Sequence, residues 1–368
     1  MSNPKISIIM PVYNDGEHIE ESIRCVLGQT LEEYELLCVD DGSTDETPKI
    51  LKRFAEAYPE RIITIRQENQ GSAIARNAAL AAARGDYLFF LDADDLLPAP
   101  STLELLYTKA VEHDALIVGG SLVYFFGDTE ETDYAHKPGC AGQKFNSEGF
   151  IDYAAYQYDF GFQRFLYKRS FLDEEGILFP DYLRYQDPPF FVRAMYAAGR
   201  FYALPDATYK YRTSAMQVKW DGPKTRALIR GICEVAQFAQ EQNLPQLFEL
   251  TLFRLNEDFW PVVLQRALID RDLSVLDDLY TFKVVLTGAA SWLEYEDCPN
   301  ILPKLPDLLA VISQEFAGFD EMKAARDDSA QRCSILEQQY HDATTSTAWK
   351  LGRTLTWVPR KIKSRLKP

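Results

Sequence analysis

The chain has 368 residues, enough for about two domains, and 46% of them are hydrophobic, 13% aromatic. Such a composition is typical of a globular protein with an ample core and excludes collagen-like and disordered classes. The formal net charge of −16 argues against a nucleic acid partner, because a polyanion binds basic surfaces. No stretch approaches about 18 consecutive apolar residues and no signal-peptide pattern opens the chain, so we expect a cytoplasmic protein.

The first hundred residues alternate between short apolar runs and amphipathic stretches. Buried strands are predicted at residues 6–10, 36–39, 62–65 and 87–91. Helical spacing of apolar residues follows the first two strands, and an alanine-rich helix is predicted at 72–84. The run Ser43–Glu46 fits a capping box for the second helix. This alternation indicates an α/β fold with a mainly parallel sheet covered by helices on both faces.

An acidic motif stands where the fourth predicted strand stops. The apolar run 87–91 leads directly into Asp92-Ala93-Asp94-Asp95. Strand side chains at i and i+2 share a face, so Asp92 and Asp94 are expected to point together at one divalent cation. Alone, this pattern also fits a turn or a helix cap.

Polar side chains follow each of the predicted strands. They are Tyr13-Asn14, Asp40-Asp41, the run 67–71 and the acidic motif at 92–95. Ligands of open parallel sheets bind beyond the carboxyl ends of the strands. The sequence therefore predicts that four strand ends converge on one crevice.

The later part of the chain changes character. Aromatic-rich stretches begin near Ser121, and helices with acidic outer faces are predicted from Asp221 to about Leu309. We expect an α/β domain at residues 1–220, a helical domain at 221–318, a helical neck at 319–347 and a basic amphipathic tail at 348–368. No internal repeat is visible.

Four motifs occur in order with fitting intervals: residues 7–14, 39–45, 69–77 and 90–95. Together they resemble the family 2 inverting glycosyltransferases, which transfer sugars from nucleotide-activated donors. The resemblance covers roughly residues 5–215. It implies the GT-A fold, a Rossmann-like, mainly parallel sheet flanked by helices, here followed by a helical C-terminal region.

The resemblance makes Pro11, Tyr13 and Asp41 contacts to the nucleotide base. It gives Asn69 and Arg76 to the nucleoside and the diphosphate. These residue types suit the roles, because an aromatic ring stacks, a carboxylate accepts a base N–H, and a guanidinium recognises phosphate. Taken singly, Tyr13 also fits a strand-end aromatic, Asp41 a turn residue and Arg76 a solvated helix charge.

The resemblance also makes Asp92, Ala93 and Asp94 part of the donor site. The two carboxylates would hold the ribose and a divalent metal, Mn²⁺ or Mg²⁺, which neutralises charge on the departing nucleoside diphosphate. Many relatives complete the metal shell with a His shortly after the strand corresponding to 209–212. No His lies between His136 and His341, so metal binding is expected to rest on the two Asp side chains, phosphate and water.

An inverting transfer needs a carboxylate that takes the proton of the acceptor hydroxyl. In the family this residue ends a Glu-Asp pair, and here Gln186 precedes Asp187. We assign Asp187 as the general base, although it also fits the N-cap of a helix at 188–198. Further candidates for diphosphate or acceptor contacts are Lys210, Arg212, Lys219 and Trp220; a core role is an equal alternative for Trp220.

The segment from Trp349 to Pro368 contains seven basic residues and no acidic one. Basic segments with Trp bind anionic membrane surfaces, so we expect peripheral contact with the inner face of the cell membrane. The segment also resembles the tails of other bacterial glycosyltransferases of this family. The alternatives are a disordered basic tail or a basic segment that pairs with the acidic remainder of the chain.

The resulting expectation is an inverting glycosyltransferase. Its donor would be a nucleoside-diphosphate sugar, UDP first, and its acceptor a hydroxyl of a glycan or lipid-linked acceptor in cell-surface polysaccharide synthesis. One alternative is a noncatalytic nucleotide-sugar-binding or scaffolding homologue at the membrane. A nucleotidyltransferase is the other, and the missing glycine-rich, lysine-containing phosphate loop counts against it.

Overall fold

The computed structural model describes residues 3–127, 129–131, 141–213, 219–259 and 262–263. The chain divides into two compact units at Lys219 and Trp220. The predicted neck at 319–347 and the tail at 348–368 lie outside the described residues, as does the predicted helical domain beyond 263.

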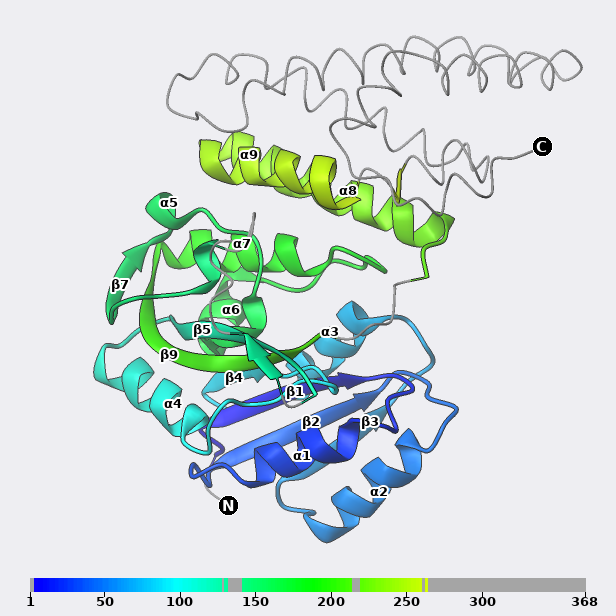
Figure 1. Cartoon of the computed structure of the whole chain (residues 1–368). Coiled ribbons are helices and arrows are strands. Elements are labelled where there is room, and N and C mark those ends of the chain that lie inside the picture. Colours follow the sequence, from blue (N-terminus) through cyan, green and yellow to red (C-terminus); the bar gives the residue numbers. More distant parts are fainter. Residues whose placement is uncertain (1–2, 128, 132–140, 214–218, 260–261, 264–368) are drawn as a thin grey trace, which may run out of the picture. The chain divides into compact units, whose positions relative to one another are not determined.

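A mixed β-sheet forms the centre of the first unit (Figure 1). Its strands are β1 (Ile6–Val12), β2 (Tyr34–Asp40), β3 (Ile62–Arg66), β4 (Tyr87–Phe90), β5 (Ile117–Phe126), β6 (Thr129–Glu131), β7 (Gly149–Asp152), β8 (Phe165–Lys168) and β9 (Arg200–Arg212). The order is β3-β2-β1-β4-β8-β5-β9-β7, and β6 pairs with β5. The first four strands are parallel, whereas β8 runs antiparallel to both of its neighbours. The predicted mainly parallel sheet is confirmed.

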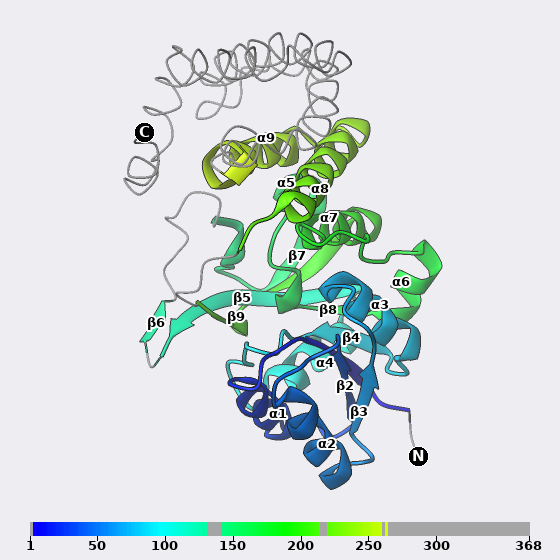
Figure 2. The same ribbon diagram turned by 90° about the vertical axis from the view of Figure 1, so that its right-hand side faces the viewer.

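Helices cover both faces of this sheet. In the first unit they are α1 (Ile19–Leu27), α2 (Thr47–Ala57), α3 (Ser72–Ala82), α4 (Thr102–Glu112), α5 (Tyr153–Tyr156), α6 (Arg169–Glu175) and α7 (Asp187–Ala198). Figures 1 and 2 show α1, α2 and α4 on one side and α3, α6 and α7 on the other. The second unit contains α8 (Gly222–Glu241) and α9 (Pro245–Arg254), followed by a π-helical turn.

The two faces of the sheet are packed differently. On the first, Ile8 and Met10 of β1 belong to one apolar core with Ile23 of α1 and Leu51 of α2. On the second, Phe90 of β4 enters an aromatic cluster with Phe162, Phe179 and Phe190. Its ring centroid lies 5.5 Å from Phe162, 5.3 Å from Phe179 and 5.5 Å from Phe190. The Arg76 guanidinium lies over two rings of this cluster, those of Phe162 and Phe179.

The capping box predicted at Ser43–Glu46 is wrong. Helix α2 begins at Thr47, and no side chain caps it from Glu46. The Ser43 hydroxyl instead accepts the Asn14 backbone N–H at 2.9 Å. Ser43 therefore holds the loop after β2 against the loop after β1, a contact between distant segments that a local motif does not reveal.

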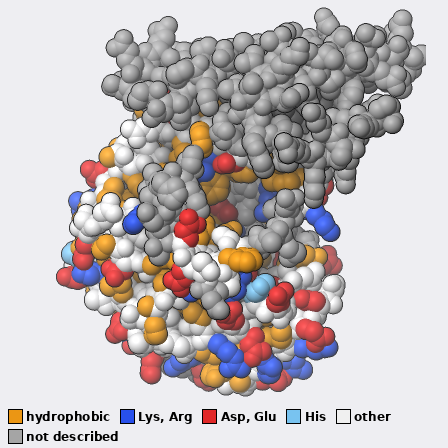
Figure 3. Space-filling view, viewed as in Figure 1, with side chains coloured by type: hydrophobic (Ala, Val, Ile, Leu, Met, Phe, Trp, Pro, Cys, Tyr) orange, Lys and Arg blue, Asp and Glu red, His pale blue; other side chains and the backbone are white. Residues whose placement is uncertain are grey.

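Charges are mixed on the surface of the first unit. Figure 3 shows acidic and basic side chains interspersed over α1 and α2, where Glu20 pairs with Arg24 and Arg53, and Lys49 pairs with Glu46. This face therefore offers no surface of a single sign. Of the helices in the described ranges, none is long and apolar enough to cross a bilayer.

Candidate active site

The predicted nucleotide side lies at the carboxyl ends of β1 and β2. Val12 and Asp40 are partners in the parallel ladder, so Tyr13 and Asp41 follow neighbouring strand ends. Tyr13 is 52% exposed, which leaves its ring free to stack on a base. Pro11 is half-buried and Asn69 exposed, on β1 and on the loop after β3 respectively.

Asp41 organises the loop at 67–71. Its buried carboxylate accepts the side-chain amide of Gln67 at 2.8 Å and the backbone N–H groups of Gln70 and Gly71 at 2.9 and 2.8 Å. Two of these donors share Oδ1, so Oδ2 retains one lone pair for a ligand. Asp41 therefore fixes the conformation of the loop at 67–71 through hydrogen bonds within the protein.

Gly42 allows this loop to approach closely. Its φ is +79°, and a Cβ at this position would lie 2.9 Å from the Asn69 backbone nitrogen. Glycine meets both demands because it tolerates positive φ and has no side chain. The approach sets Asn69 beside the turn that contains Asp41.

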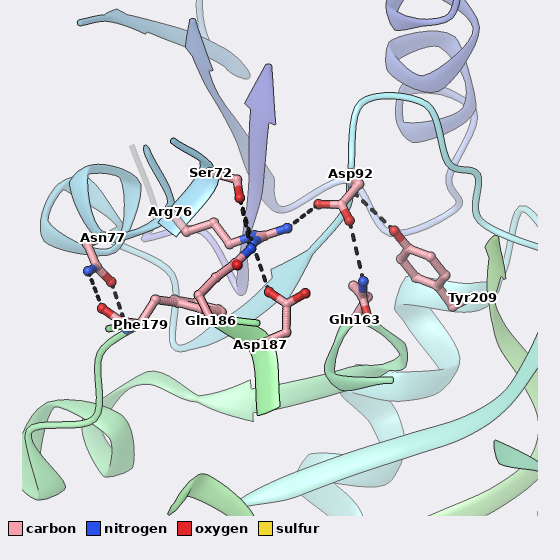
Figure 4. Close-up of polar contacts among 9 residues, drawn as sticks. All are labelled: Ser72, Arg76, Asn77, Asp92, Gln163, Phe179, Gln186, Asp187 and Tyr209. Carbon is pink, nitrogen blue, oxygen red and sulfur yellow. Dashed lines mark hydrogen bonds and ion pairs between the residues drawn. The ribbon is translucent and has the colours of Figure 1, made fainter. Parts of the chain in front are cut away.

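The acidic motif lies in a turn, not in a strand. Strand β4 ends at Phe90, and the Asp95 N–H donates to the Asp92 carbonyl at 3.0 Å. The expectation that Asp92 and Asp94 share a strand face is therefore wrong. Asp92 accepts Arg76 Nη2 at 2.6 Å and Gln163 Nε2 at 3.4 Å (Figure 4).

Asp94 has a different environment. Among the described residues, no other residue donates a hydrogen bond to its carboxylate. Burial raises the pKa of Asp94 to about 6, and the charges of Asp92 and Asp15 add to the rise while His18 opposes it. His18 bonds Asp15 at 2.8 Å, and no sequence motif indicated that either residue would lie near the acidic turn.

The acidic turn is the candidate site for a divalent cation. Hard cations take oxygen ligands and keep phosphate oxygens and water in their shell. Asp94 offers such oxygens amid like charges that a cation would neutralise. Within the described ranges, no group of three or more acidic, His or Cys side chains is placed to hold a metal. A metal held here would therefore draw other ligands from the substrate and from water.

Strand β9 fixes the acidic turn, a role that sequence reasoning missed. The Tyr209 hydroxyl donates to Asp95 Oδ2 at 2.6 Å and accepts the Asp92 N–H at 3.1 Å. Asp95 also accepts the Arg212 N–H at 2.7 Å. Burial and the charges of Asp92 and Asp94 raise the pKa of Asp95 well above its usual value. Tyr209 and Asp95 thus fix the conformation of the acidic turn.

The predicted cations of β9 have protein partners in this structure. Lys210 pairs with Glu130 and lies over the Phe125 ring. Arg212 donates to the Asp94 carbonyl and to the Glu21 carboxylate, each at 2.6 Å. Arg212 lies beside the acidic turn, whereas the ammonium group of Lys210 is paired on the β6 side.

The two remaining candidates fall at the boundary of the units. Lys219 closes the first unit and Trp220 opens the second. The Trp220 ring packs edge-on to Phe259, with centroids 6.3 Å apart. Their assignment to the site remains a prediction.

Asp187 is the first residue of α7 and lies across from the acidic turn (Figure 4). Gln186 occupies the cap position without a side-chain cap bond, so the alternative role of Asp187 as N-cap is wrong. The Asp187 carboxylate instead accepts Arg76 Nη1 at 3.1 Å. Burial raises the pKa of Asp187 to about 6, Arg76 opposes the rise, and Asp92 adds to it.

Arg76 therefore joins the two acidic groups of the site. Its side chain is 4% exposed and donates to Asp92 and Asp187 at once. The guanidinium lies over the rings of Phe162 and Phe179, 5.0 and 5.3 Å from their centroids. Sequence reasoning placed Arg76 at the diphosphate, and nothing in the sequence indicated its pairing with Asp187.

The described residues thus form an α/β protein with polar side chains after β1, β2 and β3, an acidic turn after β4, and a half-buried carboxylate at the start of α7. Residues 7–176 match the family model described as Glycosyl transferase family 2. The resemblance in the sequence is thereby confirmed.

One relative is the poly(ribitol-phosphate) beta-glucosyltransferase of Bacillus spizizenii, which is 31% identical over 211 residues. The match covers 56% of this chain and 32% of the relative. The chain spans between 18% and 61% of the length of four other curated relatives that it matches.

Two solved structures share the fold. Residues 1–349 of S. aureus TarS in complex with UDP superpose with a TM-score of 0.64 at 18% identity, covering 85% of this chain and 91% of TarS 1–349. A Pyrobaculum calidifontis mannosyltransferase in complex with GDP-Man and Mn²⁺ superposes with a TM-score of 0.50 at 21% identity, covering 93% and 87%. The fold is GT-A, as the resemblance implied.

Proposed function

We propose that this protein is an inverting glycosyltransferase that moves a sugar from a nucleoside-diphosphate sugar to an acceptor hydroxyl. The observation that carries the proposal is the placement of Asp187 opposite the acidic turn, with Arg76 bonded to both. A base and a donor-side carboxylate are thus set on two sides of one site, which is what a displacement at the anomeric carbon requires.

The Asp187 carboxylate acts as general base. It takes the proton of the acceptor hydroxyl as that oxygen attacks the anomeric carbon. The bond between this carbon and the diphosphate oxygen breaks, its electron pair leaves with the nucleoside diphosphate, and the configuration inverts. With a pKa of about 6, Asp187 is mostly ionised at neutral pH and still basic enough to share the proton in the transition state.

Asp94, together with Asp92, would hold a divalent metal, Mn²⁺ or Mg²⁺. Bound there, the metal neutralises charge on the departing diphosphate. The support is the concentration of carboxylates at the turn and the presence of Mn²⁺ in the complex of the P. calidifontis mannosyltransferase.

A UDP-sugar is the proposed donor and a cell-surface glycan or its lipid-linked precursor the proposed acceptor. The complex of TarS with UDP supports the nucleotide, and the exposed Tyr13 ring supplies a stacking surface for a base. The poly(ribitol-phosphate) for which the B. spizizenii relative is named supports the acceptor class.

A nucleotide screen tests this proposal. We expect UDP to raise the melting temperature more than GDP, dTDP or CDP, and more with Mn²⁺ than without, because a ligand bound only by the native state stabilises it. UDP-sugars should then be consumed with release of UDP. No shift with any nucleotide would favour a noncatalytic scaffolding homologue, and a shift without turnover would favour a noncatalytic nucleotide-sugar-binding one. Pyrophosphate as product would favour a nucleotidyltransferase.

The turnover rate should depend on pH through Asp187. The base works only when ionised, and burial raises its pKa to about 6, so kcat should fall as the pH drops below about 6 and level off above it. UDP release measured between about pH 5 and 8 checks this, with the melting temperature followed over the same range as the control for unfolding. A flat profile would contradict the assignment.

We also propose that residues 349–368 bind the anionic face of the membrane. Their seven basic residues would each contribute about 1 kcal/mol near such a surface. Deleting 349–368 should weaken binding to phosphatidylglycerol vesicles in a sedimentation assay and leave the shift with UDP unchanged. Equal vesicle binding by the shortened chain would reject this role.

A further inference from the structure

The segment that carries Asp187 to its position has no regular structure of its own. Residues 176–186 connect α6 to α7 outside any helix or strand. Leu178 and Leu183 in this segment are 54% and 48% exposed, so packing of their side chains does little to hold it. Tyr185 has a φ of +64°, which is unusual for a bulky residue and persists only where surrounding contacts impose it.

Helix α3 supplies such contacts at three points (Figure 4). Arg76 bonds Asp187 at 3.1 Å, and Ser72 accepts the Gln186 amide at 3.0 Å. Asn77 makes two bonds: its Nδ2 donates to the Phe179 carbonyl at 2.8 Å and its Oδ1 accepts the Phe179 N–H at 3.0 Å. Asn77 thus holds both backbone groups of one residue in the segment.

Phe179 connects Asn77 to the helix that carries Asp187. Its buried ring stacks on Phe190 of α7, with centroids 3.9 Å apart and planes 9° apart. The Arg76 guanidinium lies over the same ring, 5.3 Å from its centroid. The residue that Asn77 holds therefore supports both the helix that begins at Asp187 and the cation that binds its carboxylate.

We propose that Asn77 is a positioning residue for the general base. Through Phe179 it fixes α7 and Arg76 together, and so sets the place of the Asp187 carboxylate opposite the acidic turn. Asn77 has no bond to Asp92 or Asp187 in this structure, so it acts at one remove from the reacting atoms. This inference rests on the proposed function, because it requires Asp187 to be the base.

The test compares variants of the full chain. UDP release with Mn²⁺ and poly(ribitol-phosphate) as the acceptor is measured for UDP-glucose, UDP-N-acetylglucosamine and UDP-galactose, and the fastest of the three is used throughout. Asn77→Ala should lower kcat by about 10- to 100-fold, the scale expected for a small misplacement of a reacting group. The KM for the donor and the affinity for UDP should stay within about threefold. Asn77→Asp keeps the acceptor for the Phe179 N–H and should lose less.

Ser7→Ala is the matched control for lost stability. The Ser7 hydroxyl also makes two buried bonds, to Glu35 Oε1 at 2.6 Å and from the Gly85 N–H at 2.8 Å, but it lies at the amino end of β1, away from the site. Urea unfolding should show a loss of stability in both Ser7→Ala and Asn77→Ala. Only the latter should lose kcat; an equal loss in Ser7→Ala would overturn the proposal.

A double variant separates positioning from a general effect on the fold. If Asn77 acts through Asp187, then Asn77→Ala should cause little further loss in an Asp187→Asn chain. A full additional loss there, or a normal kcat for Asn77→Ala alone, would overturn the inference and leave the proposed function standing. Full turnover by Asp187→Asn, or no turnover of any UDP-sugar by the unaltered chain, would overturn the proposed function itself.

Discussion

Replacing Asp187 by Asn is expected to lower kcat by about 10²- to 10⁴-fold, the range of a general base. The amide has nearly the same shape and still offers an oxygen to Arg76, but it does not take up the acceptor proton. UDP affinity should stay within about twofold, because Asp187 lies on α7 and the residues proposed to contact the base, Tyr13 and Asp41, follow β1 and β2. Initial rates of UDP release and thermal shifts with UDP measure the two effects.

Asp181→Asn is the matched control for this substitution. It makes the same chemical change in the segment that leads to α7, at a side chain that is exposed to solvent. We expect it to retain the turnover of the unaltered chain. Wild-type rates in Asp187→Asn would show that another group takes the proton.

Removing the charge of Arg76 should have the largest effect on stability. Arg76→Met leaves Asp92 and Asp187 without their shared cation in a largely buried site, and breaking a buried pair in this way costs about 3–5 kcal/mol. Urea unfolding at neutral pH measures the loss. Turnover should fall with it, since the Asp187 carboxylate loses its hydrogen-bonded partner.

Two further measurements identify the cause as uncompensated charge. Adding Asp187→Asn to Arg76→Met should restore part of the stability, because one uncompensated carboxylate disappears. The deficit should also shrink as the pH falls toward about 5. The pKa of Asp187 is already raised in the folded chain and would rise further without Arg76, so protonation favours the folded state. A deficit that is independent of pH would point to lost packing instead.

The local parts of the fold were predictable from the sequence. Strands β1, β2 and β4 are mostly apolar and buried along nearly their whole length, because both faces of a central parallel strand are covered. Helix α3 follows its alanine-rich pattern. The prediction that polar side chains meet at the strand ends depended only on the direction of parallel strands, and the contacts of Asp41 with Val12 and with the loop at 67–71 confirm it for β1, β2 and β3.

The contacts that make the site were not predictable in the same way. The Tyr209–Asp95 bond joins residues 114 positions apart, and the Arg76–Asp187 bond joins residues 111 positions apart. Both depend on the position of β8, which lies antiparallel between β4 and β5. No local sequence pattern predicts this position. The strand geometry assumed for Asp92 and Asp94 failed because β4 ends two residues before the first of them.

The reversal of strand direction between β4 and β8 also divides the first unit into two parts, an earlier and a later module. All proposed donor residues from Pro11 to Asp94 belong to the part that precedes the reversal, whereas Asp187 follows it. The family match ends at residue 176, before Asp187, the proposed base. An exchange of the later module between relatives should therefore change the acceptor while preserving the donor. The exchanged protein should be active only where the new module provides hydrogen-bond partners for Ser72, Arg76 and Asn77. These α3 side chains make the bonds between the two modules.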